Sequence, residues 1–118
     1  MIQLAAKEAL SILEIEIGEN VTGQDFESFR SRLDRLVSQA EEADLMVRME
    51  NISKFKVGAV VRDCEAFFRK FNNIHKIAVV GNSDQLATLI KADFIIPGVE
   101  CKYFDTYDMD LAWYWLKY

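Results

Sequence analysis

Hydrophobic and polar positions along the chain follow two different periods. In residues 9–17 the apolar residues Leu13, Ile15 and Ile17 share one face, and glutamates fall between them. This period of two predicts a strand with one buried side. Apolar runs predict further strands at residues 1–4, 44–49, 76–80 and 99–104.

Periods of three and four residues predict helices between these strands. The first helix begins at Thr22, which forms a capping box with Asp25, and its apolar positions are Phe26, Phe29, Leu33, Leu36, Val37 and Ala40. The second spans residues 56–71, with a stripe of Val57, Val60, Val61, Cys64, Phe67, Phe68 and Phe71. A short helix from about residue 83 to residue 92 and a terminal helix capped by Asp105 or Thr106 complete the set.

Strands and helices therefore alternate after an initial pair of strands. This order predicts an α/β layered domain with a mixed, mostly parallel sheet. No linker, repeat or low-complexity segment interrupts residues 1–118, so we expect a single domain. Pro97–Gly98 marks a turn before the last strand.

Composition and charge exclude some classes of function. The net charge is −5 and no cluster of lysine and arginine appears, which argues against a nucleic-acid partner. The sequence has no run of about 18 apolar residues, so we expect no transmembrane segment. The amino-terminal residues do not have the pattern of a signal peptide, so we expect none. Cys64 and Cys101 have neither metal-ligand nor disulfide-framework spacing. We therefore expect a protein of the reducing cytoplasm without metal or cofactor.

Several strings along nearly the whole chain resemble the SpoIIAA-like family, which has the STAS fold. These are "IGENVTGQDFESF", "FKVGAVVRDCEAFFRKF", "HKIAVVGNSDQLATL", "IIPGVECKYFD" and "LAWYWL". The resemblance implies a bacterial or archaeal protein with a sheet of four or five strands and helices mainly on one face. It also implies either binding of apolar, lipid-like molecules or binding of a regulatory protein, as in anti-sigma factor antagonists.

The antagonists of this family carry a phosphorylated serine at the start of their second helix. Here the equivalent stretch is "NISKFKVGAV". Gly58 matches the helix-start glycine, but Lys56 and Val57 precede it, and Ser53 is displaced. The resemblance thus implies an antagonist-type domain without the usual phosphorylated serine.

The sequence contains no set of reactive residues that would predict an enzyme. "KIAVVGNSDQL" has a single glycine, Gly81, whereas phosphate loops need several, so Ser83 or Asp84 is interpreted as a helix cap. His75 is the only histidine and is expected at the surface or in a loop, without a nucleophile beside it. Both cysteines are interpreted as small buried hydrophobic residues. The aspartates at 105, 108 and 110 lack calcium-loop spacing.

The terminal helix has apolar residues on two faces. Met109, Ala112, Trp113 and Leu116 form one stripe, and the second consists of Leu111, Tyr114, Trp115 and Tyr118. A surface helix normally buries one face only. The second stripe therefore either covers neighbouring loops or stays partly exposed, as single aromatic residues often do, or it binds a partner, for which tryptophan and tyrosine are favoured.

Two non-enzymatic functions follow. The first is a cytoplasmic binding domain that holds an apolar or lipid-like molecule between the second and third helices, lined by Val57, Val61, Phe68 and Phe94. The alternative is a protein-interaction or regulatory domain, with homodimer formation included. Its expected contact residues are Ser53, Phe55, Gly58, Trp113 and Trp115.

Overall fold

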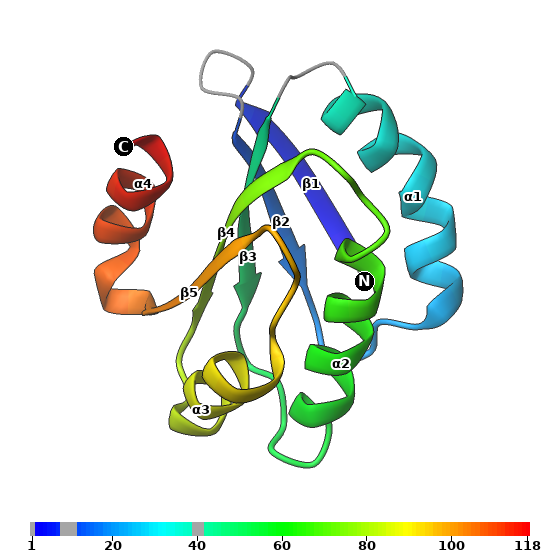
Figure 1. The fold of residues 1–118 in the computed structure, drawn as a ribbon. Helices are drawn as coiled ribbons and strands as arrows, with labels where there is room; N and C mark the ends of the chain where they lie inside the picture. Colours follow the sequence, from blue (N-terminus) through cyan, green and yellow to red (C-terminus); the bar gives the residue numbers. More distant parts are fainter. Residues whose placement is uncertain (1, 8–11, 39–41) are drawn as a thin grey trace.

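A computed structural model describes residues 2–7, 12–38 and 42–118. Within these ranges, five strands form one sheet in the order of the sequence (Figure 1). They are β1 (Ile2–Lys7), β2 (Ile12–Ile17), β3 (Ala43–Met49), β4 (Ile74–Gly81) and β5 (Glu100–Asp105). β1 is antiparallel to β2, and β2 to β5 are parallel. The predicted mixed, mostly parallel sheet is confirmed.

The described residues form four α-helices, which cover the sheet unequally. They are α1 (Gly23–Ser38), α2 (Val57–Phe68), α3 (Asp84–Asp93) and α4 (Met109–Lys117), the last preceded by a short 3-10 helix, Thr106–Asp108. The first three pack on one face of the sheet, and α4 packs on the other (Figure 1). Helices on mainly one face are what the fold class predicted.

The alternating pattern explains how each strand serves both layers. Leu13, Ile15 and Ile17 of β2 point into the large core beneath α1 to α3, whereas Met46 and Ala78 point toward α4. Adjacent strand residues point to opposite faces, so the central segments of β3 and β4 are apolar on both faces. Their residues 45–47 and 77–80 are all buried.

Local signals also fix where the helices begin. The amide of Thr22 donates to Asp25 Oδ2 at 2.9 Å, and the amide of Asp25 donates to Thr22 Oγ1 at 3.2 Å. This is the predicted capping box of α1. At α3, Ser83 Oγ accepts a hydrogen bond from the amide of Leu86, so Ser83 is the predicted N-cap.

Some predicted positions need correction. The second helix ends at Phe68 rather than residue 71, because the chain turns before Asn73, whose backbone carbonyl accepts from the amide of Ala43. His75 lies within β4 and not in a loop, although its side chain is partly exposed. Met1, the strand positions 9–11, the side chain of Leu36 and Ala40 lie outside the described part of the structure.

Candidate functional site

The carboxyl ends of the four parallel strands meet at one edge of the sheet. This edge is where open α/β sheets place their binding sites, because the loops that follow the strands converge there. The loop from residue 50 to residue 56 joins β3 to α2 at this edge, and we call it the α2 entry loop. It contains Ser53 and Phe55 and leads into Gly58 in the first turn of α2.

The α2 entry loop is tied to the loops on both sides of it. Toward β2, the backbone amide of Ser53 donates to Glu19 Oε2 at 2.9 Å, and Lys56 Nζ donates to Asn20 Oδ1 at 3.3 Å. Glu19 and Asn20 belong to the turn between β2 and α1. These two bonds join chain segments more than 30 residues apart in the sequence.

Two more bonds hold the other side of the loop. The amide of Asn51 donates to Asn82 Oδ1 at 3.5 Å, and Gln85 Nε2 donates to the carbonyl oxygen of Lys54 at 3.2 Å. Asn51 has a φ of 60°, a left-handed conformation that asparagine adopts more readily than most residues. The loop is therefore bonded from both neighbouring strand ends.

Within the loop, backbone bonds close a turn that starts α2. The carbonyl oxygen of Ser53 accepts from the amides of Lys56 and Val57, each at 3.0 Å. Lys56 occupies the N-cap position and makes no capping bond with its side chain. Ser53 thus contributes its backbone to the helix start, and its amide is held by the Glu19 carboxylate.

Phe55 projects from this loop with 89% of its surface exposed. Lys54 Nζ lies 5.4 Å from the centre of its ring, in cation–π distance. Single exposed apolar residues are common at protein surfaces, but a ring this exposed is fully available to a partner. The structure therefore places two of the predicted contact residues, Ser53 and Phe55, in one restrained loop.

The glycines at this edge differ in what they require. A Cβ at Gly58 would meet only Arg62 Nη1, at 3.8 Å, so this position has room for a side chain. A Cβ at Gly81 would collide with the side chain of Leu86 and approach the carbonyl oxygen of Met49 to 3.0 Å. Gly81 is thus a packing glycine at the end of β4, which agrees with a helix cap at Ser83.

The predicted contact residues on α4 lie elsewhere, on the opposite face of the sheet. Trp113 and Trp115 are half-buried and pack against the smaller core. The Trp115 ring lies 5.8 Å from that of Phe104, and Lys76 Nζ donates to the Trp115 carbonyl oxygen at 3.0 Å. Trp115, of the second predicted stripe, is therefore only partly exposed. Its role in partner binding stays a prediction.

The predicted ligand-binding residues lie in the large core. Val57, Val61, Phe68 and Phe94 are each no more than 2% exposed. The rings of Phe68 and Phe94 are 6.4 Å apart in an edge-to-face arrangement, so they fill the space between α2 and α3. Their function as ligand contacts stays a prediction.

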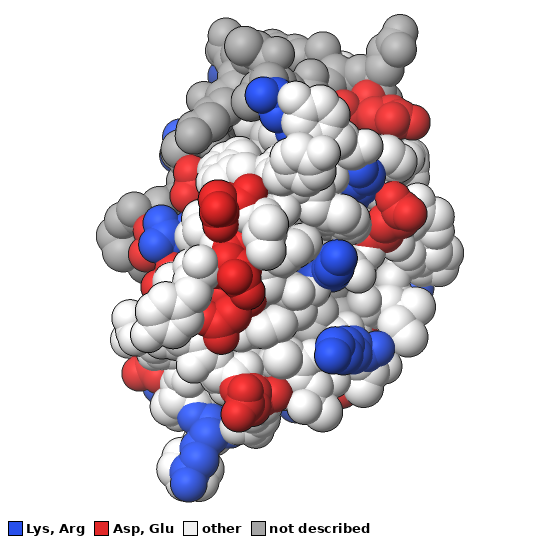
Figure 2. Space-filling view, turned by 90° about the vertical axis from the view of Figure 1, so that its left-hand side faces the viewer, with Lys and Arg blue, Asp and Glu red and all other residues white. Residues whose placement is uncertain are grey.

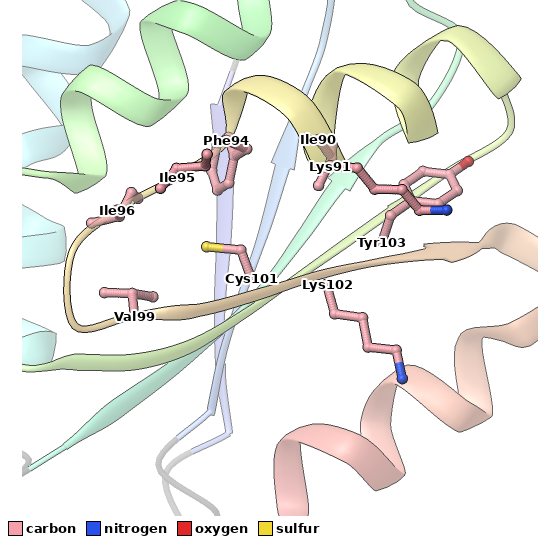
Figure 3. A pocket seen from close by; sticks show the side chains of 9 residues that line it. All are labelled: Ile90, Lys91, Phe94, Ile95, Ile96, Val99, Cys101, Lys102 and Tyr103. Carbon is pink, nitrogen blue, oxygen red and sulfur yellow. The ribbon is translucent and has the colours of Figure 1, made fainter.

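A groove of about 510 Å³ lies nearby, between α3 and β5 (Figure 3). Phe94 is the one predicted ligand residue that lines it, together with Ile90, Lys91, Ile95, Ile96, Val99, Cys101, Lys102 and Tyr103. Figure 3 shows the Cys101 sulfur pointing into the groove and the Lys102 amine pointing toward α4, away from it. The groove is therefore mainly apolar.

The thiols are held in their protonated forms. Burial raises the pKa of Cys101 to about 11, and burial raises the pKa of Cys64 further. Cys101 is only half-buried, which corrects the expectation that both cysteines are core residues. Neither thiol carries the thiolate that a nucleophile needs at neutral pH.

A polar cluster surrounds His75 at the opposite end of the sheet. Its Nδ1 lies 3.5 Å from Asp44 Oδ1 and 3.7 Å from Glu42 Oε2. Burial raises the pKa of Asp44, while His75 and the amide of Lys76 act in the other direction. The described residues contain no group of three or more His, Cys, Asp or Glu side chains placed to hold a metal ion.

None of the helices in the described ranges has the length and apolar character needed to cross a lipid bilayer.

Comparison with curated proteins gave no match, and comparison with solved structures gave none either. The sequence model of the SpoIIAA-like family matches residues 12–117. This match covers β2 to α4 and includes the α2 entry loop. The chain belongs to the SpoIIAA-like family, with the α/β architecture of a STAS-type regulatory or binding domain.

Proposed function

We propose that this chain is a non-enzymatic regulatory domain that binds a partner protein through the α2 entry loop. Family membership supports the general class. The observation that carries the proposal is the exposed Phe55 ring on a loop that hydrogen bonds restrain from both sides. We further infer a cytoplasmic protein, since both cysteines are free, as is usual in a reducing compartment.

The energetics of such a surface favour association. Burial of a phenylalanine side chain in a partner contributes about 1.5–3 kcal/mol. A loop already fixed by contacts with Glu19 and Gln85 loses less conformational entropy on binding than a free loop. A single anchoring ring on a restrained loop therefore suits a binding hot spot.

Charge indicates what the partner surface contains. Lys54 and Lys56 flank Phe55 in the sequence, although the whole chain has a net charge of −5. A partner pocket with an apolar floor for the ring and acidic side chains at its rim would complement this loop. This mode of binding needs no phosphorylated serine. A phosphate on Ser53 would lie near the Glu19 carboxylate and be repelled by it.

The test is quantitative affinity purification from the host cells with tagged wild-type protein and two variants. Phe55→Ala should lower recovery of the specific partner about tenfold or more, because it removes the anchor ring. Ile95→Ala is the matched control, since Ile95 is 63% exposed and lies outside the α2 entry loop. Equal recovery with Phe55→Ala and the control would refute the proposal.

The second candidate function is binding of a small apolar molecule in the groove between α3 and β5. The observation in its favour is the apolar lining that Phe94 and Ile96 share with Cys101. Native mass spectrometry of the purified protein should then show an extra mass that denaturation removes. Added fatty acid should also slow labelling of Cys101, whose sulfur points into the groove (Figure 3). Absence of both effects would exclude this candidate.

A further inference from the structure

A row of exposed side chains runs along α4 and the 3-10 helix before it, on the side away from the sheet. Tyr107, Leu111, Tyr114 and Tyr118 are between 54% and 95% exposed. They are four of the six large apolar side chains that are exposed among the described residues, the others being Phe55 and Ile95. We call these four residues the α4 stripe.

Helix geometry explains why the α4 stripe faces solvent. Leu111, Tyr114 and Tyr118 are spaced by three and four residues, which places them on one side of α4, and Tyr107 lies in the 3-10 helix that leads into it. Ala112 and Leu116, which are buried against the sheet, fall on the opposite side at 100° per residue. The rings of Tyr114 and Tyr118 lie 4.8 Å apart, so they already form one continuous aromatic surface.

We propose that the α4 stripe binds the same stripe of a second copy of this chain, with the two helices antiparallel across a two-fold axis. The spacing of the stripe is symmetric about the midpoint between positions 112 and 113. An antiparallel pair centred there brings Tyr107 opposite the second copy's Tyr118 and Leu111 opposite its Tyr114. Such a self-complementary surface is what a two-fold dimer requires.

Charges beside the α4 stripe select the antiparallel direction. Asp110 and Lys117 are seven residues apart and therefore lie on the same flank of the helix. In the antiparallel pair, Asp110 lies about 3 Å along the axis from the second copy's Lys117. A parallel pair would instead place Asp110 on the side of the second copy's Asp108, which carries a like charge. Figure 2, which views the α4 side of the molecule, shows acidic and basic side chains beside wide uncharged surface.

The length of the stripe sets the strength of association. Residues 107–118 span about 18 Å as a helix, and two such helices bury an area at or below the lower end of the range for stable interfaces. We therefore expect a reversible dimer with a dissociation constant in the micromolar range. Tyrosine suits this contact because it is enriched at interfaces and tolerates exposure in the monomer.

Sedimentation velocity of the full chain over a concentration series, from about 1 μM to about 500 μM, tests the proposal. The mass should rise from 13.6 kDa toward twice this value. Leu111→Asp, in the middle of the stripe, should weaken the dimer about tenfold or more. Ile95→Asp is the matched control, because Ile95 is a similarly exposed aliphatic residue outside α4, and it should leave the dimer unchanged.

A charge exchange distinguishes this pairing from any other. Asp110→Lys alone brings like charges together across the dimer and should weaken it, and the double variant Asp110→Lys/Lys117→Asp should restore it. Thermal unfolding at low concentration verifies that each variant is folded. A protein that stays monomeric at the highest concentration, or a dimer insensitive to Leu111→Asp and to the exchange, would overturn the proposal.

Discussion

The same substitution at two glycines of the sheet edge should have opposite effects on stability. Gly81→Ala adds a methyl group that collides with the Leu86 side chain and lies 3.0 Å from the Met49 carbonyl oxygen. Leu86 is only 1% exposed, so it has no free space to move into. Overpacking of this kind costs about 1–3 kcal/mol. We expect Gly81→Ala to lower the free energy of unfolding by this amount.

Gly58→Ala should raise the free energy of unfolding by about 0.5–1 kcal/mol. The new methyl group meets only the tip of Arg62, and alanine is the better helix former in the first turn of α2. Urea unfolding followed by far-UV circular dichroism measures both variants against the wild type. A Gly81→Ala variant as stable as the wild type would refute the packing argument. A destabilised Gly58→Ala variant would show that the helix start needs its glycine.

Three further effects follow from the described contacts. The pKa of Cys101 is raised to about 11 from an ordinary value of 9.0. Its thiolate fraction at pH 8 should therefore be about a hundredfold below that of an unperturbed thiol. Labelling of the native protein with an aromatic disulfide reagent should be correspondingly slow. Rapid labelling at pH 8 would contradict this. Thr22→Ala removes the α1 cap and should cost about 1 kcal/mol in urea unfolding, whereas an unchanged midpoint would show that the cap is dispensable. Asp44 has a folded-state pKa above its ordinary 3.8, so its ionisation disfavours folding as the pH rises through that pKa. The stability of Asp44→Asn relative to the wild type should therefore be greatest near pH 7 and decrease toward pH 4, and a pH-independent difference would count against it.

The sequence was sufficient for the elements of this fold and much less so for the site. Alternation in β2 and the apolar stripe of α2 are local patterns, and the structure confirms both. The capping box at Thr22 is likewise a matter of residues three positions apart. Such features can be predicted from the sequence because each depends on residues within one helical turn or one strand.

The contacts that restrain the α2 entry loop could not be read in the same way. Glu19 bonds to the amide of Ser53 across 34 residues, and Gln85 bonds to Lys54 across 31. These bonds depend on the order of β2, β3 and β4 in the sheet. A single glutamate or glutamine gives no sequence pattern from which such a long-range hydrogen bond could be predicted. Sequence reasoning named Ser53 and Phe55 but missed the residues that hold their loop.

The terminal helix shows that residues of one predicted stripe need not be equally exposed. Trp115 shares the second predicted stripe with Leu111, Tyr114 and Tyr118. At 100° per residue it lies at the side of the helix, where its large ring reaches Phe104 of β5. The exposed row consists of Leu111 and three tyrosines instead.

Site-specific photo-crosslinking in the host cells tests the partner-binding role of the α2 entry loop most directly. A photoreactive phenylalanine analogue replaces Phe55 in one strain and Ile95 in another, since both positions are exposed and Ile95 lies outside the loop. The account predicts a discrete crosslinked protein of higher mass at position 55 and none of that mass at position 95. The same adduct at both positions, or adducts at position 95 alone, would contradict it.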